Sequence, residues 1–369
     1  MSNGVDVSGR ADRIRARWVG FEALLVSDLT NIRWLTGFTG SAGTAVVLPD
    51  QIVLVTDGRY GEQAERQLAA AGSTASVRVG RTAAEQLALV NDAVASITRL
   101  GFESAHTSHA RWRQLDEMLS LELVPTSGVV ECGRRTKDAT EIALMERACA
   151  IADQALAEVA PSLVPGRTEA QVRNDLERLM RELGAAGPSY DTIVATGPVN
   201  APMPHHRPTD TVIEDGHTVI IDVGALVEGY HSDMTRTFVV GQPSPFQLEV
   251  YHAVLAAQVA GVAAVRPGVT TLELDTVCRS LLDDAGFGEW FTHGTGHGVG
   301  LLIHEDPFIN SAGGWVLQEG DVVTVEPGVY RGGFGGVRVE DLVEVTSTGG
   351  RALTRSPKDS PCLPSAPTT

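Results

Sequence analysis

Basic residues, and lysine above all, are scarce in this sequence. Its 369 residues include 29 lysine and arginine residues against 46 aspartate and glutamate residues, which gives a formal net charge of -17 at pH 7. Lysine occurs only at Lys137 and Lys358. Nucleic acids and anionic membrane surfaces attract proteins through basic surfaces. We therefore expect neither nucleic acid nor a membrane among the partners of this protein.

Closely spaced cysteines and long apolar runs are also missing. The four cysteines, at positions 132, 149, 278 and 362, are scattered, unlike those of a disulfide framework or a thiolate metal site. The polar N-terminal segment has no apolar core of a secretory signal. No apolar run reaches the ~18 residues that a membrane-spanning helix needs. We expect reduced thiols and a cytoplasmic location.

The length and the residue pattern predict two domains. Residues 1–130 alternate β-branched runs, such as IVLVT at 52–56, with Ala-, Glu- and Gln-rich stretches typical of helices. This alternation predicts a small α/β domain. We predict a linker at 131–140, where glycine and charge interrupt the pattern, and a larger domain at 141–355 that mixes helices and strands. The Pro- and Ser-rich segment 356–369 is expected to be a loose tail.

The larger domain shows clear helix signals. Apolar residues recur at helical spacing over 142–156. Thr168 and Thr270 are each followed three residues later by Gln or Glu, the capping-box pattern of a helix start. A further helix is predicted over 246–265, and strand-like runs follow these helices.

Two aspartates stand in strand-like runs on either side of a short turn. If the chain folds back about Val227 and Glu228, Asp222 faces Asp233. The Cβ atoms of such a cross-strand pair lie about 4.5–5.5 Å apart, where like charges destabilise a sheet. The register is an assumption, because a slip of one residue turns one partner to the other face.

Two glutamates repeat this arrangement. A fold about Gly333, in the glycine-rich turn RGGFGG, places Glu326 opposite Glu340. Bare charges within runs of Val and Ile are costly, and a bound cation would offset that cost. Four carboxylates suit two divalent cations, which lie ~3.5–4 Å apart in hydrolytic sites.

Three histidines lie close together in a glycine-rich stretch, at His293, His297 and His304. Glycine lets the backbone approach a ligand or a metal closely. Imidazole suits Zn, Co, Fe or Mn, whereas carboxylates favour harder ions such as Mn. A single histidine among carboxylates is unlike a structural zinc site, which prefers Cys and His.

Two adjacent histidines, His205 and His206, lie in a loop bounded by Pro204 and Pro208. Proline on both sides stiffens this segment. By composition alone the loop is better interpreted as a solvated loop with two surface histidines than as a binding site.

These motifs resemble those of the M24-type pita-bread metallopeptidases, which include methionine aminopeptidase, Xaa-Pro aminopeptidase and Xaa-Pro dipeptidase (prolidase). The resemblance is carried by IIDVGALVEGYHSDMTRTF, THGTGHGVGLLIHEDP, TVEPGVY and GVRVEDLVEV, in this order. NIRWLTGFTGSAGTAVV and TDGRY resemble the creatinase-type domain of the proline-specific members, which disfavours methionine aminopeptidase. The implied fold is α+β, a C-terminal pita-bread (creatinase/aminopeptidase) catalytic domain preceded by a smaller α/β creatinase-type N-terminal domain.

The resemblance implies a centre of two divalent metal ions, with Mn expected first and Co, Zn or Fe as alternatives. Its five ligands would be Asp222, Asp233, His297, Glu326 and Glu340, of which Asp233 and Glu340 would bridge the ions. Further residues would contact the substrate or take part in catalysis, namely His205, His293, His304 and Arg338, with His206 as the alternative to His205. Glu326 would also accept the proton of the attacking water.

The implied activity is hydrolysis of the bond between an N-terminal residue and proline, as in a Xaa-Pro aminopeptidase. Xaa-Pro dipeptidase is the alternative, because the two activities differ in loops that admit or block residues beyond proline. A metal-free C–N hydrolase and a non-enzymatic binding module on the same fold are less favoured, since such relatives have lost ligands that this sequence retains. The resemblance also implies proline-containing peptides as substrates and a homodimer.

Overall fold

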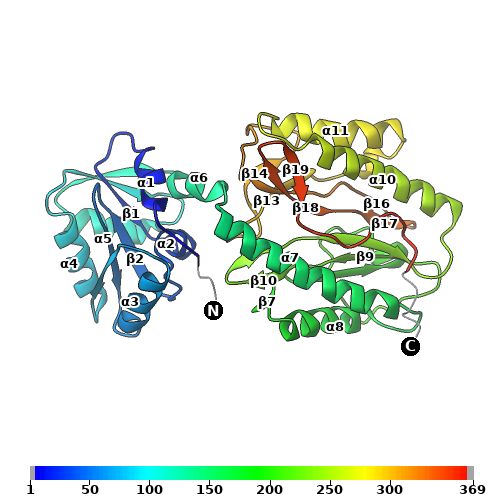
Figure 1. The fold of residues 1–369 in the computed structure, drawn as a ribbon, viewed down its shortest axis with the longest axis horizontal. Helices are drawn as coiled ribbons and strands as arrows, with labels where there is room; N and C mark the ends of the chain where they lie inside the picture. The colour runs from blue at the N-terminus through cyan, green and yellow to red at the C-terminus, as the bar shows by residue number, and fades with distance from the viewer. Residues whose placement is uncertain (1–4, 364–369) are drawn as a thin grey trace. The chain divides into compact units, whose positions relative to one another are not determined.

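The computed structural model describes residues 5–363, and the chain divides into two compact units, residues 1–134 and 135–369. Figure 1 shows the elements of each unit. The segment 131–140, predicted as a linker, contains the end of helix α6 (Val129–Arg135) and the start of helix α7 (Ala139–Val159). The predicted linker is therefore largely helical, with only a short non-helical stretch between the two helices.

The first unit is built on one six-stranded sheet of order β4-β3-β2-β1-β5-β6. Strand β2 pairs antiparallel with β1 and β3, and the remaining pairs are parallel. The strands are β1 (Ala23–Val26), β2 (Gly43–Val47), β3 (Ile52–Thr56), β4 (Ser76–Val79), β5 (Arg99–Glu103) and β6 (Glu122–Thr126). The helices are α1 (Arg10–Arg15), α2 (Leu29–Thr36), α3 (Gly61–Ala70), α4 (Ala83–Ala93) and α5 (His109–Met118). Strands β1 and β3 are buried along their whole length, as expected where both faces of a sheet are covered.

The second unit combines several small sheets. Their orders are β11-β10-β7, β12-β9-β8, β14-β13-β15-β18-β19 and β16-β17. The strands are β7 (Gly187–Pro188), β8 (Ile193–Thr196), β9 (Thr218–Asp222), β10 (Ala225–Val227), β11 (Tyr230–His231), β12 (Thr235–Val239), β13 (Gly296–Gly298), β14 (Glu305–Ile309), β15 (Val322–Val325), β16 (Gly328–Arg331), β17 (Gly335–Arg338), β18 (Asp341–Thr346) and β19 (Gly349–Ala352).

Two pairs of long helices accompany these strands (Figure 1). Helices α7 and α8 (Glu169–Glu182) pack on each other and on β10 and β8, whereas α10 (Pro245–Ala264) and α11 (Thr271–Asp284) pack on each other and on β19 and β14. The short helices are η1 (Ala160–Ser162), α9 (Gly197–Asn200) and η2 (Gly288–Trp290). An apolar cluster that includes Val254, Leu274 and Val343 fills the space between α10, α11 and the strands.

The predicted helix starts are confirmed. Thr168 caps α8 and Thr270 caps α11. In each case the threonine hydroxyl accepts a hydrogen bond from the backbone N–H group three residues later, and the side chain of that later residue accepts one from the backbone N–H group of the threonine. Capping boxes also begin α7 and α10. These caps satisfy backbone N–H groups that have no partner within the helix.

The predicted register of the first carboxylate hairpin is wrong: the turn lies one residue further along the chain, so the pairing is shifted by two residues. Asp222 is paired with Thr235 instead of Asp233, because the chain turns at Glu228 and Gly229. Both turn residues have positive φ, 46° and 76°, as a two-residue hairpin turn of the favoured hand requires. The turn predicted about Val227 and Glu228 would have placed a β-branched residue in that conformation, which is sterically costly.

The predicted register of the second hairpin is confirmed. Gly328 pairs with Arg338, and Val325 pairs with Asp341, so the same register places Glu326 and Glu340 across from each other. Gly333 lies in the turn with φ of 83°, a conformation that glycine adopts at little cost.

The predicted loose tail is wrong for residues 356–363, and residues 364–369 lie outside the described part of the chain. The N–H group of Val239 donates to the carbonyl of Pro361 over 2.8 Å, and the hydroxyl of Tyr251 donates to the carbonyl of Lys358 over 2.8 Å. These long-range contacts hold a segment whose composition alone is typical of a loop.

Across residues 5–363, we find no helix that combines the length and the apolarity that a membrane crossing requires.

Candidate metal centre

A cavity of about 710 Å³ in the second unit gathers every residue that the sequence predicted for the site. Its lining includes the five predicted ligands, Asp222, Asp233, His297, Glu326 and Glu340, and the predicted substrate residues, His205, His293, His304 and Arg338. These residues are separated by up to 135 positions in the chain, so the fold alone brings them together.

The ligand candidates lie in or next to strands. Asp222 ends β9 and His297 is in the middle of β13. Asp233 precedes β12, Glu326 follows β15 and Glu340 precedes β18. The ends of strands in several sheets thus supply the acidic side chains. Hydrogen bonds between the strands hold the backbone from which each of these side chains projects.

Three of the carboxylates form a compact cluster. One oxygen each of Asp222, Asp233 and Glu340 lies within 4.8 Å of the others. The Nε2 atom of His297 lies 3.5 Å from Oδ2 of Asp233 and 3.4 Å from Oε1 of Glu326. Although Asp233 does not face Asp222 across the hairpin, its carboxylate still reaches the cluster.

The orientation of His297 suits a metal ligand. Its Nδ1 atom lies 3.0 Å from the carbonyl of Gly298. A carbonyl only accepts hydrogen bonds, so Nδ1 carries the hydrogen and the lone pair of Nε2 faces the carboxylates. Fixing the tautomer from the far side of the ring is the common arrangement for metal-binding histidines.

The electrostatics of the cluster fit a cation. Burial, reinforced by the neighbouring carboxylates, raises the pKa of Asp233 and of Glu340 well above their ordinary values. Burial raises the pKa of Glu326 to about 7 and lowers the pKa of His297 to about 3. The site therefore holds a neutral imidazole beside crowded acids whose ionisation needs a compensating positive charge. Oxygen and imidazole donors of this kind suit divalent ions such as Mn²⁺.

Arg338 supplies a fixed positive charge at one side of the cluster. Its side chain is 3% exposed, and Nη2 donates to Oδ2 of Asp222 over 2.6 Å. Its Nε atom donates to the hydroxyl of Thr235 over 2.9 Å, and Nη1 donates to the hydroxyl of Tyr330 over 2.8 Å. With its donors engaged in this way, Arg338 positions Asp222 and Tyr330.

The two adjacent histidines have different surroundings. His206 is buried, and its Nε2 atom lies 2.8 Å from Oε2 of Glu169, a carboxylate in the protein interior. His205 is exposed and lines the cavity. Of the two candidates, the side chain of His205 is therefore the one available to a substrate, and that of His206 is engaged in the fold.

The remaining two histidines also lie in the cavity. The Nε2 atom of His293 lies 2.9 Å from the hydroxyl of Tyr330, and its Nδ1 atom lies 2.7 Å from the carbonyl of Gly294. Burial lowers the pKa of His293 to about 4 and also lowers the pKa of His304. The ring centroids of His297 and His304 are 4.4 Å apart. The ring of His293 is therefore neutral at pH 7.

Tyr190 belongs to the cluster although no sequence motif indicates it. Its hydroxyl contacts Oδ1 of Asp222 and lies 2.6 Å from Oδ1 of Asp233. Burial raises the pKa of Tyr190 well above its ordinary value, so the hydroxyl keeps its hydrogen. Tyr190 lies in the loop between β7 and β8, and no spacing or pairing rule links it to the aspartates.

The chain is similar to known proteins over most of its length. Residues 143–347 match metallopeptidase family M24, and residues 12–135 match the creatinase/prolidase N-terminal domain. The Bacillus subtilis protein described as uncharacterized peptidase YqhT is 40% identical over 344 residues, which cover 92% of this chain and 96% of that protein.

Solved structures extend the likeness to the whole fold. A Xaa-Pro dipeptidase from Bacillus anthracis superposes on this chain with a TM-score of 0.91 at 38% sequence identity. The superposition covers 97% of this chain and 100% of the dipeptidase chain. An X-Pro aminopeptidase from Thermotoga maritima MSB8 superposes with a TM-score of 0.87 at 31% sequence identity. The superposition covers 96% of this chain and 99% of the aminopeptidase chain. The predicted resemblance and the predicted fold class are confirmed. The chain belongs to metallopeptidase family M24 and is a hydrolase with a creatinase/prolidase N-terminal domain.

Proposed function

We propose that this protein is a Xaa-Pro aminopeptidase that uses two divalent cations, Mn²⁺ first among them. The observation that carries the proposal is the convergence of four carboxylates and one imidazole in a single cavity that is also lined by four further histidines. The relatives named above as dipeptidase and aminopeptidase support a proline-specific substrate. A homodimer in the cytoplasm remains part of the proposal, on the strength of the family resemblance and the sequence composition.

The cations of the cavity favour peptides longer than a dipeptide. Among the described residues that line it, the arginines are Arg207 and Arg338. Arg338 is buried and engaged with Asp222, whereas Arg207 is 81% exposed and forms an ion pair with Asp191. Selective binding of a dipeptide would call for a cation held ready for its free carboxylate. Neither arginine is a buried cation held ready for a free carboxylate, so we favour the aminopeptidase. The Xaa-Pro dipeptidase is the second candidate because relatives 35% and 44% identical carry that name.

The five ligand candidates, Asp222, Asp233, His297, Glu326 and Glu340, would hold the two ions. When bound, these ions would supply the Lewis acidity that activates a water molecule and polarises the scissile carbonyl. Glu326 accepts a proton from the attacking water and returns it to the departing proline nitrogen. Proton transfer by a positioned carboxylate is a general acid–base step.

Three histidines of the cavity contact the carbonyl oxygen and the proline ring of the substrate. His304, which is exposed in the cavity beside His297, donates a hydrogen bond to the carbonyl oxygen as negative charge develops there. Loss of one such donor typically reduces the rate by ~10²–10³-fold. His205 and His293 shape the pocket for the proline ring, and Tyr330 keeps His293 in place. An X-Pro bond has no N–H group and a ring of fixed shape, so a fitted pocket can select it.

The test begins with protein stripped of metal by a chelator and then supplied with Mn²⁺. Cleavage of Ala-Pro, Ala-Pro-Ala and the control Ala-Gly-Ala is followed by mass spectrometry. We expect metal-dependent release of alanine from both proline peptides and none from the control. Cleavage of Ala-Pro alone would establish the dipeptidase. Folded protein that cleaves neither proline peptide with Mn²⁺, Co²⁺, Zn²⁺ or Fe²⁺ would rule out both candidates.

A further inference from the structure

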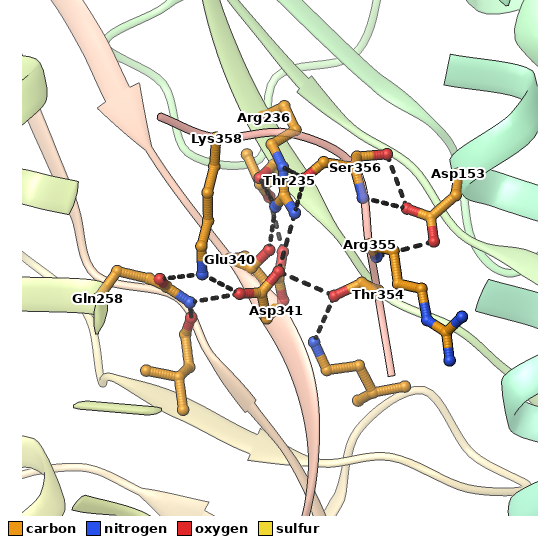
Figure 2. A network of polar contacts seen from close by, with 12 residues as sticks. Asp153, Thr235, Arg236, Gln258, Glu340, Asp341, Thr354, Arg355, Ser356 and Lys358 are labelled. Atoms are coloured by element: carbon orange, nitrogen blue, oxygen red, sulfur yellow. Dashed lines mark hydrogen bonds and ion pairs between the residues drawn. The ribbon is translucent and has the colours of Figure 1, made fainter. Parts of the chain in front are cut away.

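A buried carboxylate lies next to the ligand candidate Glu340. The side chain of Asp341 is 2% exposed and forms ion pairs with Arg236 and Lys358. Four side chains bind it, namely Arg236 (2.8 Å), Thr354 (2.9 Å), Gln258 (3.0 Å) and Lys358. Two of these come from residues 354–358, which we call the C-terminal strap (Figure 2).

Arg236 connects the strap to the backbone of the site. Its Nε and Nη2 atoms donate to the carbonyl of Ser356 over 3.0 Å and 2.7 Å. Its Nη1 atom donates to the carbonyl of Thr235 over 2.9 Å and also to the carbonyl of Glu340. The guanidinium therefore fixes the strap and two backbone segments of the site relative to one another, as Figure 2 shows.

Thr235 in turn holds the carboxylate of Glu340. Its hydroxyl donates to Oε2 of Glu340 over 2.7 Å, and the N–H group of Glu340 donates to the carbonyl of Thr235 over 3.1 Å. One Glu340 oxygen belongs to the cluster with Asp222 and Asp233. A shift of the backbone at Thr235 or Glu340 would thus move an oxygen of the candidate metal centre.

Lys358 completes the charge balance behind the site. Its side chain is 22% exposed, and Nζ lies 2.6 Å from Oε1 of Gln258 and in contact with Oδ2 of Asp341. Asp341 thus has two cationic partners, Arg236 and Lys358, in an interior where an incompletely compensated charge is costly. Removing Lys358 leaves Asp341 with one of these two cations, Arg236, and so disturbs the residue that aligns the backbone at Glu340.

We propose that Lys358 is a positioning residue for the metal centre: the C-terminal strap orients Glu340 through Asp341 and Arg236 and thereby increases the metal affinity of the cavity. The inference rests on the proposed metal centre of the preceding section. Partners that orient a metal ligand from behind typically change metal affinity or activity by about 10- to 100-fold.

The test is a titration of the full-length, metal-stripped protein with Co²⁺, followed by the visible absorption of the bound ion. We expect Lys358→Met to weaken Co²⁺ binding by about 10- to 100-fold and to change the absorption band, which reports ligand geometry. Peptidase activity should return at saturating metal. Lys358→Arg should restore much of the affinity because it keeps the charge.

Arg355→Met is the matched control, because it removes a cation from the same strap. The side chain of Arg355 is exposed and points away from the network, and only its backbone N–H is drawn bonded, to Asp153 (Figure 2). We expect its Co²⁺ affinity to equal that of the unaltered protein. Thr354→Val removes an uncharged donor to Asp341 and the acceptor of the Leu342 N–H group. It keeps both cations, so we expect a smaller loss, and it provides the test if Lys358→Met fails to fold.

Three results would overturn the proposal. The first is an unchanged Co²⁺ affinity and band in folded Lys358→Met, even if its thermal stability falls. The second is an equal loss of affinity in Arg355→Met, and the third is an unchanged affinity in Thr354→Val when Lys358→Met cannot be folded. If the unaltered protein itself binds no Co²⁺, the proposed metal centre fails first, so the two failures are distinguishable.

Discussion

The hydroxyl of Tyr190 lies 2.6 Å from Oδ1 of Asp233, inside the candidate metal centre. It also contacts Oδ1 of Asp222, so one neutral phenol bridges two acids of the first hairpin. The contact spans 43 residues of sequence, and neither neighbouring residues nor a strand register requires it.

Tyr190→Phe should reduce activity while the fold persists. The substitution keeps the ring but removes the hydrogen shared by Asp222 and Asp233, and such losses behind metal ligands cost about 10- to 100-fold. We expect a fall of this size in kcat/KM for Ala-Pro-Ala at saturating Mn²⁺. Tyr60→Phe, in the first unit, is the control, because its hydroxyl forms an exposed hydrogen bond with Ser41. Equal activity of the two variants would contradict the role assigned to Tyr190.

His205 and His206 should separate activity from stability. His205→Ala should lower kcat/KM with little change in Tm, because the side chain is exposed in the cavity. His206→Ala should lower the free energy of unfolding by about 1.5–3 kcal/mol, the range for hydrogen bonds to charged groups, because it removes the buried contact with Glu169. Urea unfolding and steady-state kinetics of both variants provide the check. The reverse pattern would make His206 the substrate histidine.

His231 should make the protein less stable in acid. Burial lowers the pKa of His231 from 6.5 to about 4, and its Nδ1 atom lies 2.7 Å from the hydroxyl of Ser189. Between these two pH values the unfolded chain binds a proton that the folded chain does not, so stability is full above pH 6.5 and declines as the pH falls toward 4.

The comparison for this prediction is His231→Asn, measured by urea unfolding at several pH values with chelator present. Relative to the variant, the unaltered protein should lose up to about 1.4 kcal/mol per pH unit across this window. Parallel pH profiles of the two proteins would show that the ring of His231 does not titrate differently on unfolding.

Lys137 should contribute to stability through one buried ion pair. Its Nζ atom lies 2.7 Å from Oε1 of Glu305, with side chains 1% and 9% exposed. Lys137→Met leaves the carboxylate without this cation, and breaking a buried pair from one side costs about 3–5 kcal/mol. We expect a loss of that order in urea unfolding, and the double change Lys137→Met with Glu305→Met should recover a large part of it. A double variant less stable than Lys137→Met would contradict this account.

The second hairpin and the helix starts could be predicted because their determinants are local. Gly333 marks the turn that sets Glu326 across from Glu340. Thr168 and Thr270 with their partners three residues on mark where two helices begin. The first hairpin failed for an equally local reason, since the positive φ at Glu228 and Gly229 moved the turn by one residue.

The sequence by itself determined which side chains are available: the acids within apolar strands, the histidines among glycines and the family they indicate. Only the tertiary structure decided which of them meet. It turned His206 toward Glu169 and left His205 in the cavity, brought Tyr190 to two aspartates, and bound Lys358 to Asp341. These contacts join residues far apart in the chain. Their geometry depends on how strands and helices pack, and local propensity and spacing carry no information about it.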